Sequence, residues 1–546
     1  MTPNPAQARL KRITGFILLG AVHALSFAPG PLPAWGLPFV ELITLALLAY
    51  FVFRAPTTRQ AALTGFWFGL GNFTLGLYWL YISLHFYGGL AAPLAATAVV
   101  LLSTVEALFI TLAVALARWL AAAQLNSISS YYRHILIAAV WASCWTAFEW
   151  LRGTLFTGFP WLNIGYAHVE GLFSGWAPVI GVYGIAWLAA FAAGAMALLA
   201  CAKDTQNDAR AAVGVGIAVI TALLGIGLGH VSWSSPQGKP LIVRLVQGNV
   251  PQSEKFDPAL MEQGLLSYMY LASLPPKDAN SAPDIIVLPE TVMPLFQDRY
   301  APQVWQQWLD IAHERQATVL MGIPLHSKAG GTERYTNSAI AFNADTPLAQ
   351  LMSGTPDMRY DKHHLVPFGE FIPPGFRWFV DAMTIPLGDF NRGTPRQALF
   401  KLDGQVLAPN ICYEDVFGEE IIQSVRPSAQ FGAGATMLVN ASNLAWFGDS
   451  WSLRQHLQIS RMRALETARP MIRATNTGMT AAIDPNGFVR AVLPAQSKGV
   501  LDVEVQGTTG LTPYVRWGNT PVLIWTALLL LLGLALRNRR PEKEPT

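Results

Sequence analysis

Long apolar runs fill the first part of the chain and return once near its end. Seven runs lie before residue 230 and an eighth lies close to the C-terminus, most of them near the roughly 20 residues that a helix needs to cross a bilayer. The pattern predicts a polytopic α-helical membrane bundle of eight spans. The runs are Ile13–Phe27, Trp35–Phe53, Ala61–Ser83, Ala91–Ala117, Ile135–Trp150, Trp176–Ala202, Ala211–Gly229 and Pro521–Leu536.

Basic residues occupy every second connection between these runs, whereas the other short connections carry only Arg152. Because Lys and Arg mark cytoplasmic loops, both termini are expected in the cytoplasm and the block between the seventh and eighth runs on the opposite face. The first run is short enough for a signal peptide, but the consistent alternation favours an uncleaved anchor. The basic residues are Arg9, Lys11 and Arg12, then Arg54 and Arg59, Arg118 and Arg133, Lys203 and Arg210, and finally Arg537, Arg539, Arg540 and Lys543.

The block between the last two runs has a different texture, in which short β-like runs alternate with helical ones after a polar linker at residues 234–238. This alternation predicts a layered α/β or α+β domain. The expected division is a membrane domain over 1–233, a catalytic domain over 241–506, and the last span with its basic tail over 511–546. The expected strands are Leu241–Gln247, Asp284–Leu288, Ala317–Leu325, Asn337–Phe342, Val406–Ile411, Thr436–Asn440 and Gly499–Val505, the expected helices are Gln303–Arg315 and Leu453–Ala468, and Asp484–Gly487 is an expected turn.

Composition supports the membrane assignment. Charged residues make up 13% of the chain, against about 25% in soluble proteins, and the mean hydropathy is +0.33. The formal net charge of +3 is small for this length and argues against a nucleic-acid partner. Of the three cysteines, Cys144 and Cys201 lie in apolar runs, so Cys412 has no obvious disulfide partner and is either buried and inert or reactive.

Two ionisable residues, Glu149 and Arg152, end the fifth apolar run. Charges at membrane depth are costly and tend to be paired or functional, and a spacing of three residues allows an ion pair on a helix. A structural pair is the favoured interpretation, with a direct substrate contact as the alternative. Glu41 and Glu106 show no partner in the sequence.

Three polar residues stand at the ends of apolar runs in the catalytic block: Glu290, Lys362 and Cys412. Strand ends are where α/β sheets place their ligands. A carboxylate can accept the thiol proton, an ammonium favours the thiolate, and the same ammonium can stabilise an oxyanion. Spacing alone leaves the plainer alternative open, in which Cys412 is a core residue and the two charges are solvated.

These residues, in this order and in their local contexts, resemble the Glu-Lys-Cys triad of the nitrilase superfamily. The contexts Leu288–Thr291, Lys362–Phe371 and Ile411–Glu414 are similar to those of its membrane-bound branch, the apolipoprotein N-acyltransferase family. The resemblance covers nearly the whole chain and implies a nitrilase-like αββα sandwich on a helical membrane bundle. It extends to Val246–Gln252, Ala445–Asp449, Arg461–Glu466, Phe148–Arg152 and Gly158–Trp161.

The resemblance implies an acyltransferase that performs the last step of bacterial lipoprotein maturation. A phospholipid would donate a fatty acyl chain to Cys412 as a thioester, and the α-amino group of an S-diacylglyceryl-cysteine lipoprotein would receive it. The implied location is the bacterial inner membrane, with the catalytic domain on the periplasmic face. The resemblance also assigns supporting roles to Glu370, Tyr413 and Glu414, and it implies no cofactor.

Several alternatives stay open at this point. His363 and His364 invite a metal site, but no cluster with ligand spacing accompanies them in the sequence, and His456 is expected only on a helix face. The apolar loop Phe371–Phe379 is interpreted either as a segment that dips into the lipid interface or as a packed subdomain. Members of the family often have Trp at the position of Phe256 and Asp at the position of Leu444. The resemblance therefore supports the triad more strongly than it supports the loops around these two residues.

Two rival functions remain. A membrane-tethered nitrilase-type amidase that hydrolyses a small amide would use the same triad, although eight spans are excessive for a tether. A transporter or sensor with an external ligand-binding domain would not depend on the thiol of Cys412.

Overall fold

The computed structural model describes residues 5–125, 131–202, 208–276, 282–329, 331–378, 389–429 and 432–538. Of the positions named so far, Lys203, Phe379, Arg539, Arg540 and Lys543 lie outside these ranges. The chain divides into two compact units. The first comprises Met1–Tyr78, Ala96–Val231 and Trp517–Thr546, and the second comprises Trp79–Ala95 and Ser232–Arg516.

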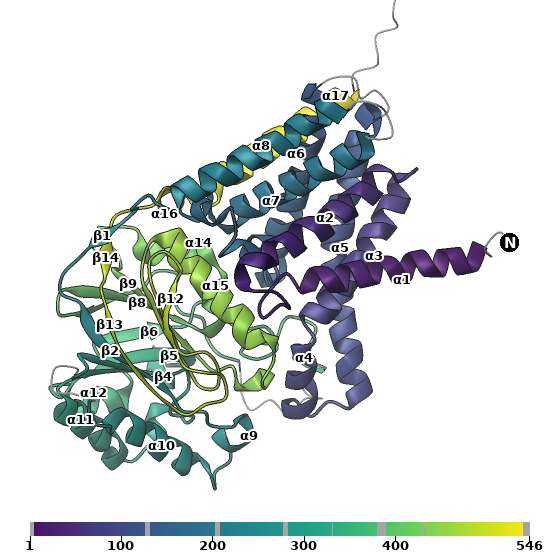
Figure 1. The fold of residues 1–546 in the computed structure, drawn as a ribbon. Helices are drawn as coiled ribbons and strands as arrows, with labels where there is room; N and C mark the ends of the chain where they lie inside the picture. The colour runs from purple at the N-terminus through teal and green to yellow at the C-terminus, as the bar shows by residue number, and fades with distance from the viewer. Residues whose placement is uncertain are drawn as a thin grey trace, which may run out of the picture. The chain divides into compact units, whose positions relative to one another are not determined.

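The first unit is built from long apolar helices (Figure 1). Six helical segments are long and apolar enough to cross a membrane, and they match six of the eight expected spans. At the other two expected spans the chain is helical, but α1 carries Arg9, Lys11 and Arg12 in its first half and α3 carries Arg59, Gln60 and Asn72, so neither is apolar enough. The count of eight therefore stays a prediction. The helices are α1 (Pro5–Ala24), α2 (Leu37–Phe53), α3 (Thr58–Gly76), α5 (Ala92–Leu125), α6 (Tyr131–Arg152), α7 (Ala177–Ala202), α8 (Asp208–Leu228) and α17 (Thr520–Asn538).

The buried charges of this unit fasten an irregular segment that follows α6. The guanidinium of Arg152 lies 3.4 Å from Glu106 Oε2 and donates to the backbone carbonyls of Phe159 (2.6 Å) and Trp161 (2.7 Å). Glu149 Oε1 accepts from the backbone N–H of Ile164 at 3.1 Å. Non-helical backbone at membrane depth needs such partners because lipid offers none. These contacts favour the structural interpretation of Glu149 and Arg152.

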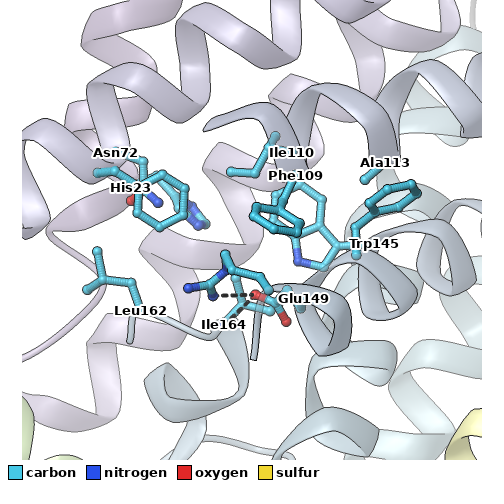
Figure 2. A pocket seen from close by; sticks show the side chains of 12 residues that line it. His23, Asn72, Phe109, Ile110, Ala113, Trp145, Glu149, Leu162 and Ile164 are labelled. Atoms are coloured by element: carbon cyan, nitrogen blue, oxygen red, sulfur yellow. Dashed lines mark hydrogen bonds and ion pairs between the residues drawn. The ribbon is translucent and has the colours of Figure 1, made fainter. Parts of the chain in front are cut away.

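The same cluster borders a small cavity (Figure 2). His23 and Asn72 lie across it from Ala113 and Trp145, and Glu149 lies between them. Its volume of about 10 Å³ is close to the room that one water molecule needs. Elsewhere in the unit Glu41 Oε2 lies 3.0 Å from His168 Nε2, so both carboxylates that lacked a partner in the sequence have one in the fold.

The second unit contains two six-stranded sheets with the orders β12-β11-β10-β9-β8-β7 and β13-β2-β3-β4-β5-β6. The expected strand ending at Ile411 is β8, and the expected turn at Asp484 joins β11 to β12. The bounds of the first sheet are β7 (Phe400–Leu402), β8 (Gln405–Ile411), β9 (Met437–Ser442), β10 (Met471–Thr475), β11 (Ala481–Ile483) and β12 (Val489–Val492). Those of the second are β2 (Leu241–Gln247), β3 (Ile285–Val287), β4 (Thr318–Ala329), β5 (Thr332–Phe342), β6 (Met358–Asp361) and β13 (Gly499–Val505). A short pair, β1 (Ser235–Pro236) and β14 (Thr508–Thr509), lies apart from both sheets.

Three hydrophobic cores show that this unit has four layers. The middle core joins the sheets face to face, with Val243 and Val287 of one against Leu407 and Val439 of the other. A second core packs α10 and α11 on the outer face of the β2 sheet, and a third packs α14 and α15 on the outer face of the β8 sheet (Figure 1). The helices are α9 (Gln252–Lys255), α10 (Met261–Ser273), α11 (Pro302–Arg315), α12 (Leu348–Ser353), α14 (Gly418–Val425), α15 (Trp451–Thr467) and α16 (Pro513–Trp517).

The segment Trp79–Ala95 belongs to this second unit, although it overlaps the end of the expected third span and the start of the expected fourth. The expected third span therefore ends early: α3 stops at Gly76, and α4 (Trp79–Ile82) follows. The indole N–H of Trp79 donates to Gln455 Oε1 at 3.2 Å, and its ring packs on Phe447 with centroids 4.7 Å apart. An apolar segment thus borders the loops that follow β9.

Candidate active site

The nucleophile candidate sits on a sharp turn between a strand and a short helix. β8 ends at Ile411, and Cys412 opens a 3₁₀ helix over Cys412–Val416. The φ angle of Cys412 is +53°, in the left-handed region where a side chain costs about 1–3 kcal/mol and persists only when its surroundings hold it. Such a turn lifts the thiol clear of the strand end, and Cys412 is half-buried.

The other two candidates, Glu290 and Lys362, lie at one edge of the β2 sheet because of its strand topology. Glu290 follows β3, which runs parallel to β4. β6 is antiparallel to β5 and β5 is antiparallel to β4, so β6 runs with β4, and Lys362 leaves it at the edge where Glu290 lies. Lys362 Nζ donates to Glu290 Oε1 at 3.3 Å, and both side chains are buried.

A glycine admits Glu290 to this position. A Cβ at Gly322 in β4 would lie 2.5 Å from the Cα of Glu290, a separation that no side chain tolerates. The backbone N–H of Gly322 donates to the carbonyl of Pro289 at 3.0 Å. The close approach of these two chains fixes the backbone that carries the carboxylate.

A second carboxylate holds the ammonium. Glu370 Oε1 accepts from Lys362 Nζ at 2.9 Å, and its Oε2 accepts from the backbone N–H of Val366 at 2.8 Å. Glu370 is 4% exposed. The lysine is therefore fixed between two carboxylates.

Glu414 ties the nucleophile turn to the lysine loop. Its Oε2 accepts from the backbone N–H of Ile411 at 2.7 Å, and its Oε1 accepts from the backbone N–H groups of His363 (2.7 Å) and His364 (3.0 Å). The hydroxyl of Tyr360 donates to the same Oε1 at 2.8 Å. Burial raises the pKa of Glu414. This carboxylate therefore fixes the position of the loop, and the ring of Tyr413 beside it forms a T-shaped pair with Phe417.

The thiol lies within electrostatic reach of the charges around it. Burial raises the pKa of Cys412, Glu290 and Glu370 raise it further, and Lys362 opposes them. Burial lowers the pKa of Lys362, but Glu290, Glu370 and Cys412 outweigh it and carry that pKa above its ordinary value. At neutral pH the site thus holds an ammonium and a protonated thiol, so Cys412 needs a proton acceptor before it can attack.

Three contributors were missed in the sequence. The Nδ2 of Asn337 donates to Glu290 Oε1 (2.8 Å) and to Glu370 Oε1 (2.6 Å), and the backbone N–H of Asn443 donates to Glu290 Oε2 (2.9 Å). Lys255 donates from Nζ to the backbone carbonyl of Glu290 at 3.1 Å. Burial lowers the pKa of Lys255 to about 7. The only signal for Asn337 was its polarity at the start of an apolar strand.

The two adjacent histidines do not converge on a metal position. His363 Nδ1 faces the backbone carbonyl of Gly393 at 2.9 Å, and His364 Nδ1 faces Glu420 Oε1 at 2.9 Å. No group of three or more His, Cys, Asp or Glu side chains with metal-binding geometry occurs among the residues that the structure describes.

Comparisons with known proteins agree along nearly the whole chain. The description "Apolipoprotein N-acyltransferase N-terminal domain" matches residues 19–195, and "Carbon-nitrogen hydrolase" matches residues 226–514. An apolipoprotein N-acyltransferase from Bordetella bronchiseptica is 54% identical over 96% of this chain and 96% of that protein. The chain belongs to the apolipoprotein N-acyltransferase family. Another member, from Ralstonia nicotianae, is 45% identical over 96% of this chain and 93% of its own length.

Among solved structures, an amidase of the nitrilase superfamily from Nesterenkonia AN1 aligns at 16% identity with a TM-score of 0.35. The alignment covers 53% of this chain and 97% of the amidase. A likeness this low supports no argument about the present site. Family membership therefore rests on the sequence relatives, and the roles of individual residues rest on the geometry.

Proposed function

We propose that this protein is an N-acyltransferase that moves a fatty acyl chain from a phospholipid, through a thioester on Cys412, to the α-amino group of an S-diacylglyceryl-cysteine lipoprotein. The observation that carries the proposal is the meeting of Glu290, Lys362 and Glu370 at the thiol, in a member of an N-acyltransferase family. Glu290, Lys362 and Cys412 are the proposed catalytic residues.

In the first half-reaction Glu290 accepts the thiol proton as the sulfur of Cys412 attacks the ester carbonyl of the lipid. The oxyanion faces the ammonium of Lys362 and the backbone N–H of Tyr413, the type of donor that stabilises such intermediates. When the intermediate collapses, the C–O bond breaks and the leaving alkoxide takes the proton from Glu290. A lysophospholipid departs, and Cys412 keeps the acyl chain as a thioester.

In the second half-reaction the lipoprotein amine attacks the thioester carbonyl. A free α-amine has a pKa of about 7.7–8.0, so a useful neutral fraction exists near pH 7. Glu290 accepts the amine proton, the C–S bond breaks, and the leaving sulfur recovers a proton from Glu290. This division into two transfers at one nucleophile predicts ping-pong kinetics.

The supporting roles follow from the contacts of each side chain. Glu370 fixes the ammonium of Lys362, and Glu414 holds the loop after Lys362 against the turn that carries Cys412. Tyr413 contributes its backbone N–H and anchors the turn through its ring. Neither a cofactor nor a metal takes part in the proposed steps.

The membrane arrangement belongs to the proposal. Residues 1–233 would form seven spans, residues 241–506 the catalytic domain on the periplasmic face of the inner membrane, and residues 511–546 the eighth span and a cytoplasmic tail. Phe376 and Trp378 are 45% and 69% exposed on the loop that follows Glu370. Exposed aromatic groups favour the lipid interface, where they would line a path for acyl chains.

The amidase is the second candidate, because the triad alone would serve it. Purified protein in phospholipid vesicles with a radiolabelled acyl chain, given a diacylated lipopeptide, separates the two functions. Labelled amide on the lipopeptide together with lysophospholipid is the expected result. Hydrolysis of a small amide to ammonia, without transfer to the lipopeptide, would favour the amidase, and full biological activity of Cys412→Ala would favour the transporter or sensor.

A further inference from the structure

Behind the nucleophile turn lies a buried polar network that the proposed steps do not use. His456 projects from α15 so that its Nε2 lies 2.6 Å from Asp415 Oδ1 and 3.2 Å from the backbone carbonyl oxygen of Cys412. His456 and Asp415 are 1% and 0% exposed. Both neighbours of Nε2 are acceptors, so Nε2 carries the proton and donates to them.

The other ring nitrogen is fixed just as firmly. Nη2 of Arg473, on β10, lies 3.0 Å from His456 Nδ1. A guanidinium only donates, so Nδ1 accepts and the imidazole is neutral. Burial also lowers the pKa of His456. Ser460 donates to Asp415 Oδ2 and Arg473 donates to Ser460, which closes the network on itself.

This network reaches the nucleophile through the backbone carbonyl of Cys412, which accepts from His456 Nε2 at 3.2 Å. That carbonyl has a second donor, Asn440 Nδ2 on β9, at 3.1 Å. In a trans peptide the C=O of one residue and the N–H of the next point in opposite directions. Holding the Cys412 carbonyl therefore fixes the direction of the Tyr413 N–H, which points away from the network.

We infer that His456 is a positioning residue that aims the backbone N–H of Tyr413 at the oxyanion by holding the carbonyl of Cys412. The same bond supports the left-handed backbone of Cys412, which its own side chain disfavours. The inference rests on the proposed function in one respect, namely that the Tyr413 N–H is an oxyanion donor. It assigns His456 no contact with the substrate and no proton transfer.

If His456 had only a structural role, a different experimental result would be expected. If His456 only stabilises the fold, its loss reduces every reaction of Cys412 together. If it aims an oxyanion donor, its loss slows acyl transfer, which builds an oxyanion, and spares alkylation of the thiol by iodoacetamide, which builds none. His456 is the right residue to change because it is neutral, whereas Asp415 and Arg473 act electrostatically on the Cys412 thiol.

Two substitutions and one control follow. His456→Phe keeps the ring volume and removes the donor, while His456→Gln offers an amide N–H near the place of Nε2. Leu457→Ala is the control, because it removes packing from the same helix without touching Cys412. Thermal midpoints in detergent micelles show how much each change costs in stability.

Acylation is followed as the mass added to Cys412 from p-nitrophenyl butyrate and, separately, from phospholipid vesicles. Removing one oxyanion donor costs about 10²–10³-fold in comparable enzymes. We expect His456→Phe to acylate at least tenfold more slowly, to alkylate within twofold of wild type, and to be partly rescued in His456→Gln. Leu457→Ala should lower the thermal midpoint and leave the ratio of the two rates unchanged.

A folded His456→Phe that acylates at the wild-type rate, or that loses acylation and alkylation in parallel, would overturn the inference. If the Phe variant does not fold, His456→Asn replaces it, because its shorter side chain does not reach the Cys412 carbonyl, and the same ratio decides. Wild-type protein that reacts with the butyrate ester but never with phospholipid would refute the proposed donor. In that case the His456 variants could still be compared by their rates of acylation from the butyrate ester.

Discussion

Both units of this chain bury charged side chains, but they give those charges different partners. In the first unit, Arg152 pairs with Glu106 and also donates to the backbone carbonyls of Phe159 and Trp161, so its charge holds a segment of chain in place. In the second, Lys362 donates to the side chains of Glu290 and Glu370, which face a thiol. The difference lies in what else the cation binds: backbone carbonyls of an irregular segment indicate a structural role for Arg152, whereas carboxylates beside a nucleophile indicate a chemical role for Lys362.

The largest effect that this comparison predicts is at Cys412. Cys412→Ala should abolish both acyl transfer and the acyl mass on the protein, since no other thiol occupies the site. Cys144→Ala, in the first unit, is the matched control and should transfer at the wild-type rate per folded molecule. Acyl transfer by Cys412→Ala, measured with labelled phospholipid and lipopeptide, would show that the charges around Cys412 do not serve a nucleophile.

Glu290→Gln should come next in size. Loss of a general base typically costs about 10²–10⁴-fold, so thioester formation should fall by that order. Alkylation of Cys412 at fixed pH should not fall, because the Glu290 charge raises the pKa of the thiol and its removal favours the thiolate. A parallel loss of both reactions, followed by mass spectrometry and iodoacetamide kinetics, would contradict the role of acceptor.

The counterpart in the first unit is Arg152→Leu. Removing one partner of a buried charge cluster costs about 3–5 kcal/mol, so denaturant unfolding in micelles should show a large loss of stability. The transfer rate per folded molecule should stay within about twofold. Glu106→Gln with Glu149→Gln in the same chain should restore part of the stability. A raised KM for phospholipid with unchanged stability would instead make Arg152 a substrate contact.

The smallest predicted effect concerns Lys255 and pH. Burial lowers its pKa from 10.5 to about 7, so between these values the unfolded chain binds more protons than the folded one, and stability rises with pH. The slope is at most about 1.4 kcal/mol per pH unit, and the full penalty applies below pH 7. Lys255→Met should remove this slope between pH 7 and 9. An unchanged slope would show that Lys255 does not titrate as its burial requires.

The parts of the fold that could be predicted from the sequence are those that depend on the periodicity and the length of its apolar runs. The strand Leu241–Gln247 and the strand Gly499–Val505 were predicted with the bounds that β2 and β13 have. The third expected span was wrong at its end, because a continuous apolar run does not reveal that α3 stops at Gly76 and that the next segment belongs to the second unit. Hydropathy reflects the composition of a segment and does not show at which residue a helix ends.

For the candidate site, the sequence predicted which chemical groups take part but not the residues that hold them in place. Glu290, Lys362 and Cys412 stand at strand ends, and the family resemblance put them in order. Asn337 and His456 were not predicted as site residues, since their roles depend on which sheet neighbours and which helix face meet the site across long stretches of chain. His456 in particular was expected on a helix face and proves to be buried against the nucleophile turn.

The central claim is that the thiol of Cys412 takes an acyl chain from a membrane lipid and gives it to an amine. Intact-mass measurement of the protein in vesicles of one defined phospholipid tests this claim most directly. The account predicts a gain equal to one acyl chain, localised to Cys412 by peptide mapping and discharged when a diacylated lipopeptide is added. Unmodified Cys412 in protein that still acylates the lipopeptide would contradict it.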